Sequence, residues 1–259
     1  MRLLQLSDPH LLAAAAGVYR QRRPLELLRR ALLQVPSLPD LLLITGDLCQ
    51  DESWGGYQHL RELLQAWPTP VALLSGNHDH PQLLRAVLGR HAVVAPALLR
   101  LEEASLVLLD SHRAGSNAGW LGPRQLQWLQ QQLAGLATRP GIPLLVAVHH
   151  PPLPIGDVLM DRIALKDGPA LLDLLRTVPT LAGVLFGHVH QHWQGVLPGR
   201  PEVELLGCPS TLCSFGPVQP CPLGRAVDPG GRWLELGPRT TLRHVLLRWA
   251  PSSSLACSV

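Results

Sequence analysis

The chain has 259 residues, of which 46% are hydrophobic and only 16% are charged, and its formal net charge is +3. Globular proteins usually contain about a quarter charged residues, so this composition predicts a sizeable buried core and excludes a disordered chain. The mild charge also argues against a nuclease, which would need a long basic stripe to track a nucleic-acid backbone. One basic cluster is either a solvated face or a site that favours anionic ligands, and it consists of Arg20, Arg22, Arg23, Arg29 and Arg30.

The cysteines and the N-terminus predict where the protein resides. The cysteine count is odd and no C-x-x-C pair occurs, which argues against a disulfide framework and against a thiolate zinc site. The start "MRLLQLSDPH" lacks the core and cleavage site of a signal peptide, and no apolar run approaches the ~20 residues of a membrane span. We therefore expect a cytoplasmic protein with no membrane partner. The five cysteines are Cys49, Cys208, Cys213, Cys221 and Cys257.

Short apolar runs alternate with helical patterns along most of the chain. The runs are apolar on both faces, which is typical of strands in sheets covered on both sides. Several helical stretches begin with proline, a favourable residue in the first turn. The order predicts a layered α/β sandwich. The predicted strands are residues 3–6, 41–45, 71–74, 106–109, 144–148 and 184–186, and the predicted helices are residues 24–34, 57–67, 81–88, 123–136 and 169–176.

The C-terminal part has a different pattern. Residues 203–206, 233–236 and 242–249 are predicted strands, the last two as a hairpin-like pair. Residues 209–231 between them are rich in proline, glycine and cysteine and have no periodicity. A loop of that length is usually functional or disordered, and we expect it to form a lid or a base pocket, or simply to pack. No linker divides the chain, so residues 1–259 are expected to form a single domain.

Polar side chains follow five of the predicted strands at the point where each strand ends. The segments are "SDPH", "TGDL", "SGNHD", "HHPP" and "GHVH". Ligands bind beyond the carboxyl ends of strands in open α/β sheets, so these segments predict one shared site. An isolated Asp, Asn or His at such a place is usually a turn former, a helix cap or a satisfied structural residue. That explanation does not account for five strand ends in succession.

The residue types at these strand ends are those of a metal site. Residues i and i+2 of an extended segment point the same way, so Asp8 with His10, and His188 with His190, are expected to present paired ligands. Carboxylate, imidazole and amide groups without thiolate suit Mn, Fe, Co or Zn. Seven ligands exceed what one catalytic ion needs and fit two ions that share a carboxylate. Such a centre activates water and neutralises a phosphoryl group, which predicts phosphoester hydrolysis.

The ordered motifs D-x-H, G-D, G-N-H-D, H-H-P and G-H-x-H resemble the calcineurin-like metallophosphoesterase superfamily. Stretches such as "LSDPHL", "LLLITGDLCQD", "SGNHDHP", "LFGHVHQ" and "CPSTLCSF" are similar to those of bacterial class III cyclic nucleotide phosphodiesterases. The resemblance implies a four-layer α/β/β/α sandwich with two mixed sheets. It also implies two divalent or trivalent ions (Fe, Mn, Zn or Co), the first held by Asp8, His10 and His190, the second by Asn77, His149 and His188, with Asp47 bridging them.

The resemblance further implies roles for the neighbouring side chains. His149 rather than His150 is the expected ligand, because the family places the first His of this pair on the metal. His150 would then lie behind the ligands, and Asp79 would support the loop or His78. A hydroxide bridging the ions would attack phosphorus in line, and His78 or a metal-bound water would protonate the leaving alkoxide. Asn77, His78 and His190 are the residues expected to contact substrate.

The substrate implied is a small-molecule phosphodiester, a 3′,5′-cyclic nucleotide and first of all cyclic AMP, hydrolysed to the 5′-monophosphate. Alternatives are a broader phosphodiesterase acting on glycerophosphodiesters or 2′,3′-cyclic nucleotides, a phosphomonoesterase, and a non-catalytic binding module on the same scaffold. Trp54, Trp120 and Trp193 follow motif-bearing segments and would either stack on a purine or pack in the core or rim. The C-terminal strands would either close a sheet or pair with a second subunit in a homodimer.

Overall fold

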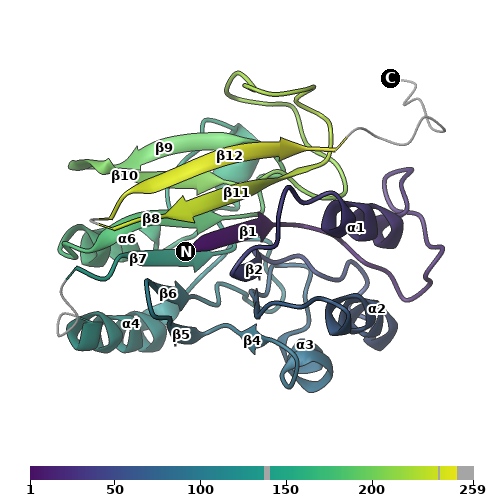
Figure 1. Cartoon of the computed structure of the whole chain (residues 1–259), viewed down its shortest axis with the longest axis horizontal. Coiled ribbons are helices and arrows are strands. Elements are labelled where there is room, and N and C mark those ends of the chain that lie inside the picture. The colour runs from purple at the N-terminus through teal and green to yellow at the C-terminus, as the bar shows by residue number, and fades with distance from the viewer. Residues whose placement is uncertain (137–140, 239, 250–259) are drawn as a thin grey trace.

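A computed structural model describes residues 1–136, 141–238 and 240–249. In these ranges the chain forms two six-stranded sheets that lie against each other, with helices on both outer sides (Figure 1). The N-terminal strand lies inside the first sheet, between strands from the two ends of the chain. The predicted four-layer α/β/β/α arrangement with two mixed sheets is confirmed.

The first sheet joins the beginning of the chain to its C-terminal strands. Its central strands run parallel from β1 to β4, while β11 pairs antiparallel with β1 and β12 antiparallel with β11. The predicted C-terminal hairpin is therefore confirmed, and it completes this sheet. In spatial order the strands are β12 (Leu242–Arg248), β11 (Gly230–Leu236), β1 (Arg2–Leu6), β2 (Leu41–Ile44), β3 (Val71–Leu73) and β4 (Val93–Val94).

The second sheet is built from the middle of the chain. Strands β6, β7, β8 and β10 are parallel, and each edge strand pairs antiparallel with its neighbour. In spatial order the strands are β5 (Ala97–Arg100), β6 (Ser105–Leu108), β7 (Leu144–Val148), β8 (Leu181–Phe186), β10 (Arg200–Gly207) and β9 (Trp193–Leu197).

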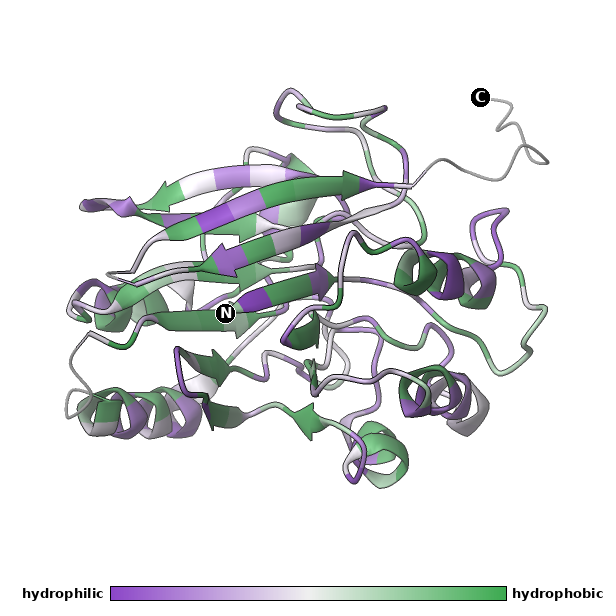
Figure 2. Cartoon of the chain, in the orientation of Figure 1, coloured by the Kyte–Doolittle hydropathy of each residue, from purple (hydrophilic) through white to green (hydrophobic). Residues whose placement is uncertain are grey.

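The alternation of side chains along the strands explains why the runs are apolar on both faces. In β2, Leu41 and Leu43 belong to the core between the two sheets. Leu42 and Ile44 belong to the core between the first sheet and its helices. Successive side chains point to opposite faces of a sheet, so a strand with both faces covered must be apolar throughout. The interior strands are accordingly mostly hydrophobic, whereas β11, β12 and the helices mix hydrophobic and hydrophilic residues (Figure 2).

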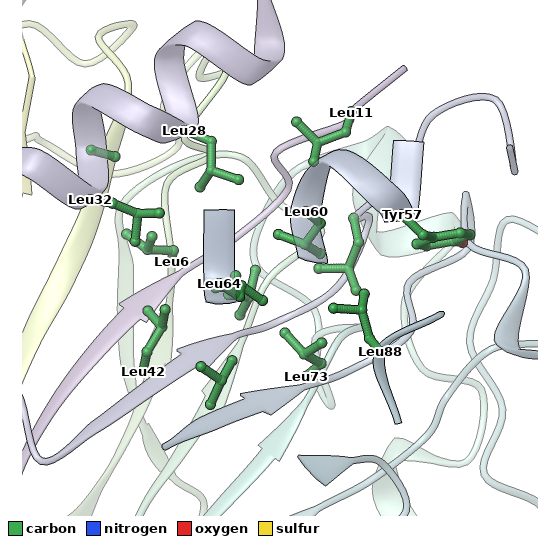
Figure 3. Close-up of a cluster of buried hydrophobic side chains, with 14 of the residues drawn as sticks. Leu6, Leu11, Leu28, Leu32, Leu42, Tyr57, Leu60, Leu64, Leu73 and Leu88 are labelled. Atoms are coloured by element: carbon green, nitrogen blue, oxygen red, sulfur yellow. The ribbon is translucent and has the colours of Figure 1, made fainter. Parts of the chain in front are cut away.

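Each sheet is covered by its own helices. Helices α1 (Pro24–Leu33), α2 (Trp54–Gln65) and α3 (Pro81–Leu88) cover the first sheet. Figure 3 shows this packing, with Leu28 of α1, Leu60 of α2 and Leu88 of α3 turned toward the strands. Helices α4 (Gly122–Leu136) and α6 (Gly168–Arg176) cover the second sheet, and α5 (Val158–Arg162) is a single short turn. None of the helices in the described part of the chain combines the length and the apolar composition that crossing a membrane requires.

Several element boundaries differ from the sequence-based ones. The helix expected to begin at Tyr57 begins at Trp54, because the Ser53 hydroxyl caps it by accepting a hydrogen bond from the Gly56 amide at 3.0 Å. This cap outweighs the low helix propensity of two glycines. Strands β4, β5 and β9 and helix α5 were not predicted, because each is too short or too polar for its periodicity to be recognised.

Candidate metal centre

The five strand ends singled out by sequence meet in one place. Backbone hydrogen bonds join the segments that follow β1 and β2, from Asp8 N to Gly46 O at 3.0 Å and from His10 N to Asp47 O at 2.9 Å. The segments that follow β7 and β8 are joined in the same way, from Gly187 N to His149 O at 3.0 Å. The predicted convergence at the carboxyl ends of these strands is therefore observed, across both sheets.

The backbone conformation at these side chains differs from the extended one that the sequence predicted. Asp8 and His10 were expected to lie on an extended segment, yet their φ angles are 51° and 50°. His188 and His190 have φ angles of 67° and 48°, and Asp47 has 47°. Left-handed conformations are uncommon for residues with a β-carbon and collect at functional sites. The paired ligands thus converge through left-handed turns and not through the alternation of a strand.

One group of ligand atoms surrounds Asp8. His190 Nε2 lies 3.2 Å from Asp8 Oδ1 and 3.0 Å from His10 Nε2. His10 Nε2 in turn lies 3.8 Å from Asp47 Oδ2. The ligand atoms of Asp8, His10, Asp47 and His190 all lie within 4.8 Å of one another, and all four side chains are buried. This is the group that the family resemblance assigns to the first ion together with the bridging carboxylate.

A second group begins at the other oxygen of the same carboxylate. His149 Nε2 lies 3.5 Å from Asp47 Oδ1 and 3.4 Å from Asn77 Oδ1. The His149 and His188 rings are 5.1 Å apart, edge to face. Asp47 therefore directs Oδ2 toward the first group and Oδ1 toward the second, which is the arrangement required of a bridging ligand.

His150 lies close to the second group, but its ring nitrogens are engaged elsewhere. Nδ1 of His150 is 2.8 Å from Ser111 Oγ, and Nε2 is 3.2 Å from the carbonyl oxygen of Asn117. A carbonyl only accepts, so Nε2 carries the hydrogen and Nδ1 accepts from the serine hydroxyl. His150 lies within ligand distance of His149 and His188. It nevertheless has no lone pair left for a cation, as expected of a residue behind the ligands.

Hydrogen bonds also orient the expected ligand histidines. Nδ1 of His149 donates to the carbonyl oxygen of Thr45 at 2.6 Å, and Nδ1 of His190 donates to that of Cys213 at 3.2 Å. Each bond places a hydrogen on Nδ1 and turns Nε2 toward the carboxylates. Partners of this kind determine the tautomer of metal-binding histidines.

The protonation of the site shows that its carboxylates require positive charge. Burial would raise the pKa of Asp8 and Asp47, but His190 lowers the pKa of Asp8, and His149 lowers that of Asp47 well below its usual value. Burial would likewise lower the pKa of both imidazoles, yet Asp8 raises the pKa of His190 to about 10 and Asp47 raises that of His149 to about 9. Cations would supply the same compensation and displace these protons.

The other two histidines have the neutral form that metal binding needs. Burial lowers the pKa of His10 to about 4 and that of His188 to about 3. Within the described residues, Nε2 of His188 is buried without a hydrogen-bond partner. An unpaired polar atom in a buried site calls for a partner. The donor set of carboxylates, imidazoles and an amide oxygen fits two metal ions.

Asp79 supports the loops that carry the ligands. Its carboxylate accepts hydrogen bonds from the backbone amides of Leu48, Cys49 and Gly76 at 2.8 to 3.1 Å and from the Tyr57 hydroxyl at 3.0 Å. Asp79 is fully buried, and this burial and the nearby Asp47 raise its pKa to about 7. Of the two supporting roles expected for Asp79, the contacts favour support of the loop over support of the His78 side chain.

His78 occupies the rim of the site. It is half-buried, and its backbone amide donates to Asp47 Oδ1 at 2.9 Å. Nδ1 of its ring lies 3.3 Å from the side-chain amide nitrogen of Gln50, and the ring meets that of His10 edge-on at 5.2 Å. His78 lines an open cleft together with His10, Tyr19, Arg20, Asp47, Asn77, Asn117, Met160, Ile163, His188, His190 and Phe215.

The aromatic residues of the cleft are not those singled out by sequence. Trp193 is buried and donates to the carbonyl oxygen of Ile155 at 2.9 Å, whereas Trp54 and Trp120 are half exposed, and none of the three lines the cleft. The aromatic rings that do line it belong to Tyr19 and Phe215. Neither residue lies in a stretch with helical or strand periodicity, so the local sequence provided no signal for Tyr19. Phe215 belongs to the long loop that was expected near the rim.

The cysteines take no part in the two ligand groups. Cys49 and Cys208 are buried thiols, and Cys213 and Cys221 are half-buried thiols. Burial raises the pKa of Cys49 and of Cys208 to about 12. Neither ligand group found among the described residues contains sulfur. Cys257 lies outside the described residues.

The chain is similar to known phosphoesterases. Residues 1–192 match the family model described as calcineurin-like phosphoesterase. A probable cyclic nucleotide phosphodiesterase of Synechococcus sp. strain WH7803 is 51% identical, with the match covering 98% of this chain and 99% of that protein. The 3′,5′-cyclic adenosine monophosphate phosphodiesterase of Escherichia coli K12, CpdA, is 34% identical, and the match covers 95% and 90% of the two chains.

Solved structures agree on the fold. A crystal structure of a dimetal phosphatase from Danio rerio matches with a TM-score of 0.66 at 15% identity, over 96% of this chain and 99% of that one. At this identity the likeness concerns the fold alone. Because the family model covers most of the chain and relatives above 30% identity cover nearly all of it, the chain belongs to the calcineurin-like phosphoesterase family.

Proposed function

We propose that the protein is a phosphodiesterase with a two-metal centre that hydrolyses 3′,5′-cyclic nucleotides, cyclic AMP first of all, to 5′-monophosphates. The observation that carries the proposal is the orientation of Asp47, which presents Oδ2 to His10 at 3.8 Å and Oδ1 to His149 at 3.5 Å. One carboxylate between two imidazole groups is suited to joining two cations at the ~3.5–4 Å separation of two-metal phosphoryl sites.

The ligand roles follow from the two groups. Asp8, His10 and His190 would hold the first ion, and Asn77, His149 and His188 the second, with Asp47 shared. The geometry that supports this division is the 3.2 Å distance between His190 Nε2 and Asp8 Oδ1 and the 3.4 Å distance between His149 Nε2 and Asn77 Oδ1. Fe, Mn, Zn and Co all accept such ligands. The bound ions would supply Lewis acidity and lower the pKa of coordinated water.

His78 is proposed to hold the proton for the leaving alkoxide. Its Nδ1 lies 3.3 Å from the Gln50 amide nitrogen, so Nε2 is the ring nitrogen left to carry the proton toward the leaving oxygen. The ring lines the cleft beside His10, where its Nε2 can approach the leaving oxygen. Asn77 and His190, which line the same cleft, would border the bound phosphoryl group.

The cyclic nucleotide substrate is proposed from the named relatives. CpdA of Escherichia coli and that of Pseudomonas aeruginosa are both named 3′,5′-cyclic adenosine monophosphate phosphodiesterases, and each is 34% identical to this chain. A small open cleft suits a single nucleotide, and it is lined by the expected ligands His10, Asp47, Asn77, His188 and His190.

Substrate profiling with the Mn-loaded protein tests the proposal. We expect kcat/KM to be higher for cyclic AMP or cyclic GMP than for a glycerophosphodiester, a 2′,3′-cyclic nucleotide or p-nitrophenyl phosphate. Bis(p-nitrophenyl) phosphate serves as the general diester control. Negligible turnover of every 3′,5′-cyclic nucleotide alongside rapid cleavage of the control would contradict the substrate. Less than about one ion per chain and no hydrolysis of any ester would favour a binding module instead.

Three broader predictions accompany this function. A single domain over the whole chain is supported by β11 and β12, which extend the sheet that contains β1. A cytoplasmic location is supported by four cysteines that are free thiols. A homodimer would use the exposed edge of β12, where Val245 is 58% exposed, and size-exclusion chromatography with light scattering would measure it.

A further inference from the structure

A two-residue turn beside the metal centre carries Arg20 into the cleft. Tyr19 N donates to Arg22 O at 2.9 Å, and Arg22 N donates to Tyr19 O at 3.0 Å, which closes the turn around Arg20 and Gln21. The φ angles of these two central residues are 49° and 60°. Tight turns with positive φ at both central positions usually contain Asn-Gly. Two long side chains in consecutive left-handed conformations indicate backbone strain that a function could require.

The guanidinium of Arg20 lies over two aromatic rings. Its Cζ is 5.0 Å from the centre of the Phe215 ring and 5.4 Å from that of Tyr19. Phe215 stacks on the His190 ring at 4.4 Å with an interplanar angle of 3°, and Tyr19 contacts the His10 ring at 5.5 Å. The guanidinium is therefore separated from the first ligand group by one aromatic layer. We call Tyr19, Arg20 and Phe215 the Arg20 platform.

The nitrogen atoms of Arg20 remain available to a ligand. Within the described part of the chain, the Arg20 guanidinium forms no hydrogen bond or ion pair, it lies over the two rings, and the residue is exposed. All three platform residues line the cleft, as do the apolar side chains of Met160 and Ile163. The outer part of the cleft thus combines aromatic rings, a guanidinium with free N–H donors and apolar side chains. Flat nucleobases bind to surfaces of this kind.

We propose that the Arg20 platform binds the base of a nucleotide whose phosphate occupies the metal centre, and that Arg20 is a specificity-determining residue. This inference rests on the proposed function. Phosphate is the less suitable partner for Arg20, because a diester carries one negative charge and the metal centre, one aromatic layer away, would already neutralise it. The base is the remaining flat group of the substrate, and it offers both a π face and hydrogen-bond acceptors to a guanidinium.

Two product analogues that differ only by the base test the proposal. Inhibition constants of 5′-AMP and ribose 5-phosphate are measured against hydrolysis of bis(p-nitrophenyl) phosphate by the Mn-loaded protein. In Arg20→Ala we expect 5′-AMP to bind about tenfold more weakly, the size of one lost stacking partner, while ribose 5-phosphate changes less than about twofold by the same argument. Bound metal, measured by elemental analysis, should not change.

Arg23→Ala is the matched control. Arg23 is exposed, its side chain forms no capping hydrogen bond on α1, and it does not line the cleft. Its substitution by alanine removes the same charge as the substitution of Arg20. It should leave both inhibition constants unchanged. Arg20→Lys keeps the charge without the planar guanidinium and should lose most of the preference for 5′-AMP. The proposal would be overturned if Arg20→Ala weakened the binding of both ligands equally or left the inhibition constant of 5′-AMP unchanged. It would also be overturned if Arg20→Lys kept the full preference for 5′-AMP.

The two proposals can fail separately. If the protein hydrolyses cyclic AMP but Arg20→Ala keeps its preference for 5′-AMP, the Arg20 platform is wrong and the proposed function stands. If no cyclic nucleotide is hydrolysed and 5′-AMP nonetheless binds through Arg20, the substrate is wrong and the base-binding role stands. Calorimetric titration of 5′-AMP into the Mn-loaded protein supplies this readout without any turnover.

Discussion

The backbone amide of His78 donates to Oδ1 of Asp47 at 2.9 Å. This bond ties the "GNHD" segment to the "GD" segment through main-chain atoms, so it does not depend on the imidazole of His78. The carboxylate, in contrast, faces both ligand groups. Two residues that touch each other should therefore respond differently to substitution.

Asp47→Ala and Asn77→Ala should abolish hydrolysis and reduce bound metal, because each removes a ligand oxygen and Asp47 serves both ions. His78→Ala should keep its metal and lose about 10²- to 10⁴-fold in kcat, the usual contribution of a general acid. Elemental analysis and steady-state kinetics on the same preparations measure both quantities. A fully active Asp47→Ala protein without metal would refute the two-ion centre.

Gly76→Ala should disturb the metal centre without changing any ligand. A β-carbon on Gly76 would overlap Asp47 Oδ1 and lie 2.7 Å from His149 Cε1, inside the closest approach that packing allows. We expect reduced metal content and a large loss of kcat/KM. Gly216→Ala is the control, since a β-carbon there meets no atom within 4 Å. Equal metal content in the two variants would show that the loop moves aside at no cost.

Tyr57→Phe should destabilise the fold through the Asp79 support. The Tyr57 hydroxyl donates to Asp79 Oδ1 at 3.0 Å and accepts from His80 N at 2.7 Å, and the side chain is fully buried. Its removal leaves the partly buried His80 amide without its partner, at a cost of about 1–3 kcal/mol. Urea unfolding followed by fluorescence measures the loss. Tyr19→Phe should be nearly neutral, because within the described residues the Tyr19 hydroxyl has no hydrogen-bond partner; an equal loss in both variants would contradict this account.

His150 should make stability depend on pH. Burial lowers its pKa well below the ordinary value of 6.5, so the folded protein keeps it neutral while the unfolded chain binds a proton below that pH. Its contribution is complete above pH 6.5 and is lost as pH falls toward the folded pKa. The loss amounts to about 1.4 kcal/mol per pH unit. Unfolding free energies at pH 7.5, 6.5 and 5.5 with excess chelator should fall less steeply in His150→Gln; parallel slopes would show that His150 does not titrate differently on folding.

The sequence could predict the layered α/β fold because the apolar pattern of each strand is a local property of the chain. A strand such as Leu41–Ile44 is apolar at every position, and that pattern arises only where both faces are covered. The residue types after the strands predicted a metal site for the same reason, since carboxylate and imidazole chemistry belongs to each side chain. The helix that begins at Trp54 was placed too late because a single cap, Ser53, decided its start.

The amino-acid sequence by itself determined the covered sheets, the order of the motifs and the kinds of ligand atoms available. Only the tertiary structure decided which atoms face one another, because His10 and His190 meet at 3.0 Å across a separation of 180 residues. It also decided the left-handed backbone at Asp8 and His188, the engagement of both His150 nitrogens and the position of Arg20 over two rings. Side-chain chemistry and burial preference are properties of single residues and short runs, whereas orientation and pairing result from contacts between distant segments.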